Sequence, residues 1–468
     1  MLYIDNNLTP SDLLPAIERM WQLSAAKILA IEQTWSPEAG APVFTVRGRY
    51  TSRAWTDWTH GFQFGSALLQ FDATGEEHFL QLGREGTYRH IPIHVTHTGV
   101  HDHGFNVVST YGNLWRMIRE GRISRDENEL RLCELAIRCS GAVQASRWTH
   151  TADGGGYIYS FNGPHSLFAD TIRTLRVLAL AHRLGHVLKE EGDRPVSLLE
   201  RLISHARATA RYTVYYSEGR DIYDVRGRVA HESLFNPKDG RYRCPSTQQG
   251  YSPFSTWTRG LAWVMLGFAE QLEFIDTLDD AQLEPFGGRK AVQELLLQPA
   301  LATCDFYIEN TPTDGVPYWD TGAPYLRELG DYLNRPADPY NDHEPVDSSA
   351  AAIAAQGLLR LGHWLSARED SGERYWQAGL TVLRRLLEEP YLSTDGAHQG
   401  LLLHSVYHRP NGWDYVPQGR RIPCGEASMW GDYHLREVCL YVQRIATGQG
   451  YHAFFGGGGL HIGPYNTP

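Results

Sequence analysis

The sequence predicts an all-α protein whose helical hairpins wind into one closed barrel. Amphipathic runs, in which apolar residues recur three and four positions apart, follow one another along most of the 468 residues. Short and long loops alternate between these runs, and no low-complexity linker divides the sequence. A tandem solenoid is the competing arrangement, but the sequence shows no repeat of fixed period that would support it.

The helices can be placed in order along the chain. Thr9 or Ser11, followed by acidic residues, is typical of a helix start and opens the first run. The small residues from Ala350 to Ala355 allow a later helix to approach its neighbours closely. The amphipathic runs predict helices over residues 11–33, 104–119, 127–146, 166–190, 196–215, 257–274, 289–308, 347–366, 371–388 and 426–446.

Strand-like alternation is confined to two short pieces. These are FTVRGRYTSRAW at residues 44–55 and ARYTVYYSEG at residues 210–219. Because no boundary interrupts the helical pattern, we expect one domain over residues 1–468. Residues 1–55 would form an N-terminal helix and extension to it.

Composition excludes several classes of protein. Hydrophobic residues make up 42% and charged residues 21%, which is ordinary for a globular protein. The net charge of −11 argues against a nucleic-acid partner. No stretch approaches the ~20 apolar residues of a membrane span, and the first residues lack the basic start and apolar core of a signal peptide. Six scattered cysteines without a CxxC pair indicate buried free thiols of a cytoplasmic protein.

Most tryptophans and tyrosines fall in the long loops or at the first turns of the expected helices. In a barrel, such positions would line one mouth. Aromatic faces stack on sugar rings, so this rim favours a carbohydrate ligand. The alternative is that these rings only fill gaps between helix ends.

The run HVTHTGVHDHGF, residues 94–105, offers four histidines and Asp102. Histidine and carboxylate ligands suit zinc or another transition metal, but the spacing is not HExxH. A second interpretation makes Asp102 the N-cap of the helix at 104–119, accepting hydrogen bonds from free backbone N–H groups. A third makes it part of a proton-transfer site. Capping and catalysis are compatible, because a capping carboxylate can also face a cleft.

A second carboxylate, Asp170, lies in NGPHSLFADTIRTL. Pro164 and Ser166 resemble a helix start, which would place Asp170 in the first or second turn. There the helix dipole stabilises the carboxylate anion. A proton donor needs the opposite, a raised pKa, which burial among aromatic side chains or a nearby carboxylate supplies. Asp102 could be that carboxylate.

The most unusual stretch is STQQGYSPFSTWTRGLAWVMLGF, which carries Gln249, Arg259 and Trp263. Arg259 and Trp263 are four residues apart and share a helix face, a pairing that suits an anionic or sugar ligand. Packing of the guanidinium on the indole is the alternative. His231, just upstream, precedes a turn and taken alone is more typical of a structural histidine.

Two later segments add polar residues. HSVYHRPNG provides Ser405, His408 and Arg409 in a locally cationic loop that could meet a carboxylate or a sulfate. WGDY, at residues 430–433, precedes the last helix and could close the barrel.

Together these segments resemble the unsaturated glucuronyl hydrolases of glycoside hydrolase family 88 and, more distantly, family 105. The resemblance runs from about residue 55 to residue 445. It is carried in family order by WTHGF (58–62), HDHGF (101–105), FADTIRTL (168–175), HESLFNPKDG (231–240), QGYSPFSTWTRGLAW (249–263), PYWD (317–320), DSSAAAIAAQGLL (347–359), LLLHSVYHRPNG (401–412) and WGDY (430–433).

The resemblance implies an (α/α)6 barrel of six helical hairpins in a single catalytic domain. It implies removal of a 4,5-unsaturated uronic acid from the non-reducing end of an oligosaccharide made by a polysaccharide lyase. The reaction is hydration of a vinyl ether, so neither a metal nor another cofactor is expected. The expected partner is the unsaturated oligosaccharide, bound by a monomer or a homodimer without nucleic acid or membrane.

The family's functional residues fall on named positions of this chain. Its general acid/base matches Asp170 and its second essential aspartate matches Asp102, which would orient the sugar and raise the pKa of Asp170 by like-charge repulsion. The expected substrate-binding residues are His101, Trp58, Trp148, His231, Gln249, Arg259 and Trp263, to which the cationic loop adds Ser405, His408 and Arg409.

The chain also departs from the family pattern. Thr174 replaces an asparagine, Gln248 stands where some members have histidine, and Pro253 and Phe254 replace acidic residues. These changes leave the preference for the leaving sugar open. A conventional inverting glycosidase, a sugar epimerase working through histidines and a non-catalytic oligosaccharide-binding barrel remain alternative functions at this point.

Overall fold

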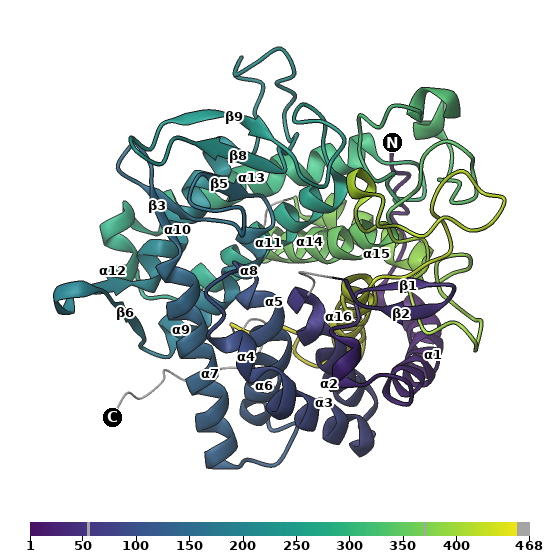
Figure 1. Cartoon of the computed structure of the whole chain (residues 1–468), viewed down its shortest axis with the longest axis horizontal. Helices are drawn as coiled ribbons and strands as arrows, with labels where there is room; N and C mark the ends of the chain where they lie inside the picture. The colour runs from purple at the N-terminus through teal and green to yellow at the C-terminus, as the bar shows by residue number, and fades with distance from the viewer. Residues whose placement is uncertain (54–56, 369–370, 456–468) are drawn as a thin grey trace.

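The computed structural model describes residues 1–53, 57–368 and 371–455 (Figure 1). Within this part of the chain, long helices alternate between an outer and an inner ring. The outer helices are α1 (Leu14–Glu32), α3 (Glu77–His90), α7 (Glu127–Ser146), α10 (Leu198–Tyr212), α13 (Gly288–Asn310) and α15 (Glu373–Leu386). The inner ring, seen around the centre of Figure 1, comprises α2 (His60–Thr74), α5 (His103–Val107) continued by η4 (Val108–Gly112) and α6 (Asn113–Arg119), α8 (Thr171–Thr174) continued by α9 (Arg176–Arg183), α11 (Thr258–Ile275), α14 (Ser348–Ser366) and α16 (Met429–Ala446).

Burial separates the two rings. Every residue of inner helix α11 is buried, whereas outer helices such as α10 and α15 keep a polar face in solvent. The inner helices therefore face the barrel axis on one side and the outer helices on the other. The predicted (α/α)6 barrel is confirmed, because six outer helices alternate along the described chain with six inner helical segments.

Four small antiparallel sheets decorate the barrel. They are β1 (Phe44–Val46) with β2 (Arg49–Thr51), β3 (Trp148–His150) with β4 (Gly156–Ile158), β6 (Val187–Lys189) with β7 (Pro195–Ser197), and the three-stranded β5 (Ser166–Phe168), β8 (Glu232–Phe235) and β9 (Tyr242–Ser246). The three-stranded sheet is important for the site. It pairs Phe168 with Glu232 and thereby brings the chain before α8 beside His231.

Most helix predictions are confirmed to within a few residues, and α7 coincides with the predicted 127–146. The predicted helix at 166–190 is wrong at both ends. Residues 166–168 form strand β5, helix begins only at Thr171, and α9 ends at Arg183. The strand predicted at 210–219 is also wrong, since its first residues complete α10 and a single bridge joins Val214 to Val229. The strand expected at 44–55 is present as β1 and β2, while Ala54 and Trp55 lie outside the described residues.

Two long helices, α2 and α3, lie outside the predicted runs, as do the one-turn helices α4 (Pro92–Val95) and α12 (Asp280–Leu283). Nearly all of α2 is buried, so it has no polar face to reveal a helical period. The inner face of α3 carries Gly83 and Gly86 where large apolar residues would be expected. A Cβ on Gly86 would lie 2.0 Å from the Phe64 ring, so glycine there lets α3 lie directly against α2.

One continuous hydrophobic core runs from Leu2 near the N-terminus to Phe455. The assignment of residues 1–468 to one domain stays a prediction. All six cysteines are free, as expected, but Cys244 is exposed and Cys139 half-buried, so not all of them are core thiols. None of the described helices combines the length and apolarity that crossing a membrane requires.

Candidate active site

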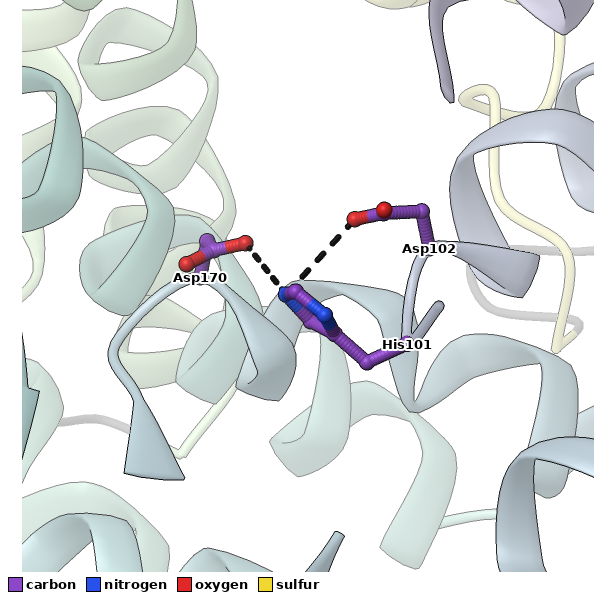
Figure 2. Close-up of side chains that lie close together, drawn as sticks. All are labelled: His101, Asp102 and Asp170. Carbon is purple, nitrogen blue, oxygen red and sulfur yellow. Dashed lines mark hydrogen bonds and ion pairs between the residues drawn. The ribbon is translucent and has the colours of Figure 1, made fainter. Parts of the chain in front are cut away.

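Two aspartates and a histidine converge at one end of the inner ring (Figure 2). His101 Nε2 lies 3.0 Å from Asp170 Oδ2 and 3.6 Å from Asp102 Oδ1. All three side chains are buried, with Asp102 and Asp170 only 7% and 8% exposed. The histidine therefore bridges two carboxylates that stand 68 residues apart in the sequence.

Both aspartates occupy the N-cap position of an inner helix. Asp102 precedes α5 and Asp170 precedes α8, yet neither side chain makes a capping hydrogen bond. The expectation that Asp102 caps its helix through its carboxylate is thus wrong. The carboxylates turn toward His101 instead, which leaves them available for chemistry.

The inner helices present their N-terminal ends to this same region. Trp58 lies just before α2, Arg259 is in the first turn of α11, Asp347 caps α14, and Trp430 is in the first turn of α16. The site is therefore built from residues distant in sequence that share one position relative to their helices. Helix N-termini carry partial positive charge, so this end of the barrel favours an anionic ligand.

The protonation states differ from the sequence-based expectation. Burial raises the pKa of Asp102 above its ordinary 3.8, and the negative charge of Asp170 adds to that shift. Burial also acts to raise the pKa of Asp170, but the charge and hydrogen bond of His101 outweigh it, so the pKa of Asp170 is lowered. The expectation that Asp102 raises the pKa of Asp170 is therefore wrong, because His101 stands between the two carboxylates.

His101 holds the proton of this group. Burial opposes its charge, but the carboxylates of Asp102 and Asp170 prevail and raise its pKa above 6.5. His101 also contacts the rings of Phe161 and Phe168, at centroid distances of 6.4 and 5.6 Å. The arrangement can store one proton close to an ionised carboxylate in an apolar surround.

His231 also lies near Asp170, since its backbone carbonyl accepts a hydrogen bond from the N–H of Ala169 at 2.9 Å. Its Nδ1 accepts hydrogen bonds from the backbone N–H groups of Gln248 and Gln249, at 3.0 and 3.2 Å. Burial lowers its pKa to about 4, so the ring is neutral near pH 7 and its proton is on Nε2. The expected histidine is thus in the site, in a defined tautomer.

Three buried polar atoms around the acid have no hydrogen-bond partner in the described part of the chain. They are Asp170 Oδ1, His101 Nδ1 and His231 Nε2. Buried polar atoms are normally satisfied by protein, water or ligand. This cluster of unsatisfied donors and acceptors therefore marks the place where a polar substrate would bind.

His101, Asp102 and Asp170 could also hold a cation. One ligand atom from each lies within 4.8 Å of the others, and in the described residues this is the one such group. The other histidines of the 94–105 run have different partners: His94 pairs with His60 at 3.1 Å, and His103 contacts Ser140 and the carbonyl of His97. That no metal takes part stays a prediction.

Arg259 is a structural centre of the site. Its Nη1 pairs with Asp347 Oδ2 at 2.9 Å, and its Nη2 donates to Gln249 Oε1 at 2.9 Å and to the carbonyl of Tyr407 at 2.7 Å. Its guanidinium carbon lies 4.6 and 4.7 Å from the ring centroids of Trp257 and Trp430. Because these groups occupy the guanidinium, Arg259 fixes Gln249 and the 405–408 loop.

Trp263 does not pair with Arg259 as the sequence suggested. It contacts Phe105 at 4.8 Å and His434 at 4.9 Å. Trp58 stacks on Trp430 with 5.1 Å between ring centroids and also contacts Phe105. Trp58 and Trp263 thus join one aromatic wall through Phe105 of the HDHGF segment.

The remaining expected residues make contacts outside the His101–Asp102–Asp170 group. Trp148, on β3, packs under Arg201 at 4.0 Å, and its ring also lies against that of His150. The Ser405 hydroxyl is 3.3 Å from that of Ser348. His408 packs on Trp413, and burial lowers its pKa to about 4, so the expected positive charge of this loop comes from half-buried Arg409.

Sequence reasoning missed the residues that hold the site together. Asp347 was interpreted only as part of a packing segment, although it both caps α14 and neutralises Arg259. Trp257 and Trp430 lay within quoted motifs, but nothing in their spacing shows that they sandwich an arginine from two helices. Of the divergent positions, Gln248 donates to Glu232 at 3.1 Å, and Phe254 is exposed against Tyr223.

Curated relatives of this chain are named as hydrolases of unsaturated glucuronyl or unsaturated chondroitin disaccharide substrates. The chain is 27% identical over 409 residues to an unsaturated glucuronyl hydrolase of Bacillus sp. (strain GL1). The match covers 85% of this chain and 89% of that protein. A protein of the same name from Formosa agariphila is 25% identical, covering 83% and 80%. An unsaturated chondroitin disaccharide hydrolase of Streptococcus agalactiae is 23% identical, covering 82% and 81%.

Solved structures agree in fold. The unsaturated glucuronyl hydrolase of Bacillus sp. GL1 superposes with a TM-score of 0.67 at 24% identity, over 91% of this chain and 98% of that one. An unsaturated glucuronyl hydrolase specific for heparin gives 0.69 at 19% identity, over 93% and 98%. No protein-family model matches the chain. In sequence over most of its length, and in its fold, the chain is therefore related to the unsaturated glucuronyl hydrolases.

Proposed function

We propose that this protein is a glycosidase that removes a 4,5-unsaturated uronic acid from the non-reducing end of lyase-generated oligosaccharides. The single observation that carries the proposal is the bridge from His101 Nε2 to the carboxylates of Asp102 and Asp170 at the mouth of the barrel. The relatives described above bear names of this activity. The ring of helix N-termini suits the uronate carboxylate of such a substrate.

The chemistry would be hydration of the vinyl ether. Asp170, taking the proton from His101 at 3.0 Å, protonates carbon 4, and positive charge develops at carbon 5. Water adds at carbon 5 and gives its proton back to Asp170, which returns it to His101. The hemiketal then opens and the glycosidic bond breaks. One carboxyl that cycles between acid and base suffices, so the fixed carboxylate separations of ordinary glycosidases are not required.

The other side chains would bind and orient the sugar. Asp102 would accept a sugar hydroxyl and hold His101 in place, and His231 would donate from Nε2. Gln249, fixed by Arg259, would present its amide to the substrate, with Trp58 and Trp263 as apolar walls. Ser405, His408, Arg409 and Trp148 would act beyond the first sugar.

We further propose that the protein works in the cytoplasm, on the strength of its free thiols. It would need no cofactor, and a monomer or homodimer would serve equally, because the residues of the candidate site come from one chain.

Loss of the ultraviolet absorbance of the sugar's double bond tests the function. Chondroitin, hyaluronan, heparin, gellan, ulvan and pectin, each digested with its lyase, would be incubated with the protein. Bleaching of at least one digest, with release of the leaving sugar, is expected. An unchanged absorbance across all six would refute the proposal.

A further inference from the structure

A cavity of about 320 Å³ lies in the barrel wall, away from the candidate active site. It is bounded by α1, α2, α3 and α16, which lie together at the lower right of Figure 1. Its apolar lining comes from Ile28, Ile31, Trp35, Phe64, Leu82 and Met429. None of the proposed site residues lines it. We call it the wall cavity.

A buried arginine lines the wall cavity. Arg436 is 1% exposed, and its Nε and Nη1 donate only to neutral hydroxyls, those of Ser24 at 2.8 Å and Ser66 at 3.2 Å. Its Nη2 has no hydrogen-bond partner among the described residues. Met429, seven residues earlier on α16, lies two turns away on the same helix face, so the cavity extends along α16.

No described carboxylate lies within 4.0 Å of Arg436. The side chain of Asp432, one turn earlier, is occupied by the Tyr50 hydroxyl and the backbone N–H groups of Leu401 and Leu402. Several other buried arginines are neutralised directly, whereas buried Arg147 donates instead to three backbone carbonyls. The neutralised ones include Arg116, Arg173, Arg176, Arg259, Arg360 and Arg444. Since arginine does not lose its proton in proteins, a buried guanidinium without an ion pair is costly.

The cavity also carries a free acceptor and a polar mouth. Gln63 Oε1 is buried without a partner in the described chain. At the mouth, Glu32 of α1 meets His78 of α3 at 3.4 Å, with both side chains well exposed. Solvent therefore reaches the mouth. The floor combines aromatic rings with the guanidinium of Arg436, on which the charge of Asp432 acts without a direct ion pair.

We propose that the wall cavity binds a small organic acid, with its carboxylate on Nη2 of Arg436 and an apolar, ring-sized body against Trp35 and Phe64. A guanidinium fork matches a carboxylate in shape and charge. Cavities of about 150 Å³ already admit benzene, so the wall cavity has room for an aromatic acid. This site is independent of the proposed glycosidase activity.

Benzoate is the probe, and benzamide is its neutral counterpart of the same shape. Calorimetric titration of the full chain is expected to show one saturable benzoate site and at least tenfold weaker benzamide binding, because benzamide lacks the charge that Arg436 would neutralise. Equal affinity for the two compounds, or no saturable binding of benzoate at tens of millimolar, would overturn the proposal.

Variants locate the site. Arg436→Gln is expected to weaken benzoate binding at least tenfold, whereas Arg89→Gln, the other arginine of the lining, changes it less than threefold. Because Arg436 is buried and its replacement can impair folding, Leu82→Trp provides a second test by filling the cavity from half-buried α3. Benzoate binding that survives in folded Leu82→Trp would place the ligand elsewhere and contradict the inference.

Discussion

The proton in the candidate site rests on His101 and not on the acid that would deliver it. Asp170 is ionised because His101 donates to it, and His101 is charged because two carboxylates surround it. His101 Nε2 would pass its proton to Oδ2 of Asp170, and rotation of the carboxyl group would then present that proton to carbon 4 of a substrate bound at the free Oδ1 side. His101 thus supplies the proton that Asp170 delivers, and no proton has to come from solvent.

Replacing Asp170 by asparagine removes the group that carries the proton. Asp170→Asn is expected to lower kcat by about 10²- to 10⁴-fold, the usual contribution of a general acid–base group. Thermal unfolding should change little, because the amide keeps the shape. Asp153→Asn, in the loop between β3 and β4, is the control and should retain activity. Residual turnover within threefold of the unmodified protein would assign the acid to another residue.

The pH profile should follow His101. Its pKa is raised above 6.5, so His101 keeps its proton to a higher pH than a free imidazole and loses it as pH rises through that raised value. Activity is therefore expected to fall on the alkaline side, and His101→Gln should lower kcat and abolish that dependence. His408→Gln is the matched control, since the pKa of His408 is lowered to about 4 and the ring is neutral throughout. An alkaline limb that persists in His101→Gln would contradict this assignment.

Asp347, the N-cap residue of helix α14, has two structural roles. Asp347 accepts from the backbone N–H groups of Ser349 and Ala350 and also neutralises buried Arg259. Asp126 caps α7 in the same way, through Asn128 and Glu129, but its cap is exposed and it has no comparable buried arginine. Comparing variants at Asp347 and Asp126 therefore separates the stabilising free energy of an N-cap from that of compensating a buried charge.

Asp347→Ala is expected to cost about 3–5 kcal/mol of unfolding free energy, because it leaves a buried charge uncompensated. Asp126→Ala should cost about 1 kcal/mol, the value of a lost N-cap. Urea unfolding of both variants measures the difference. Equal losses of unfolding free energy in the two variants would show that another group compensates the charge of Arg259.

Helix periods predicted most of the barrel, and the resemblance of HDHGF and FADTIRTL to family motifs singled out the two aspartates. The predictions that were wrong or missing have physical causes in particular elements. The segment before Asp170 has apolar residues at helical spacing, but pairing with β8 holds Ser166–Phe168 as a strand. The sequence of α3 lacks the apolar spacing of an amphipathic helix, because Gly83 and Gly86 replace large apolar residues where the helix meets α2. The Arg259–Asp347 pair joins positions 88 residues apart, which no local pattern reveals.

Buried ion pairs join helices of the inner ring and close it. Arg173 pairs with Glu270 at 2.6 Å and with Glu437 at 3.0 Å, and Arg176 reaches Glu437 at 3.3 Å. Phe454, near the end of the described chain, lies over Arg176. These contacts join α8, α9, α11 and α16, so the inner ring should unfold as one unit.

Glu437→Gln tests this closure. Burial acts to raise the pKa of Glu437, but Arg173 and Arg176 outweigh it and lower the pKa well below 4.5. The carboxylate therefore stabilises the fold above its unfolded-state pKa, and this stability is lost as pH falls through the lowered value. Glu437→Gln is expected to cost about 3–5 kcal/mol at neutral pH and to reduce the acid sensitivity of urea unfolding.

Exposed Glu127, paired with Arg125, is the control for that variant. Glu127→Gln should leave unfolding unchanged, because exposed ion pairs contribute little. If Glu437→Gln also left the free energy of unfolding unchanged, the buried ion pairs would not be what closes the barrel.

The need for the double bond distinguishes vinyl ether hydration from ordinary glycoside hydrolysis. A lyase-made unsaturated disaccharide and its saturated counterpart would be incubated in parallel with the unmodified protein and with Asp170→Asn. The unmodified protein should bleach and cleave the unsaturated sugar and leave the saturated one intact. Asp170→Asn should cleave the unsaturated sugar at least about a hundredfold more slowly and leave the saturated one intact. Cleavage of the saturated disaccharide by the unmodified protein would contradict the hydration mechanism.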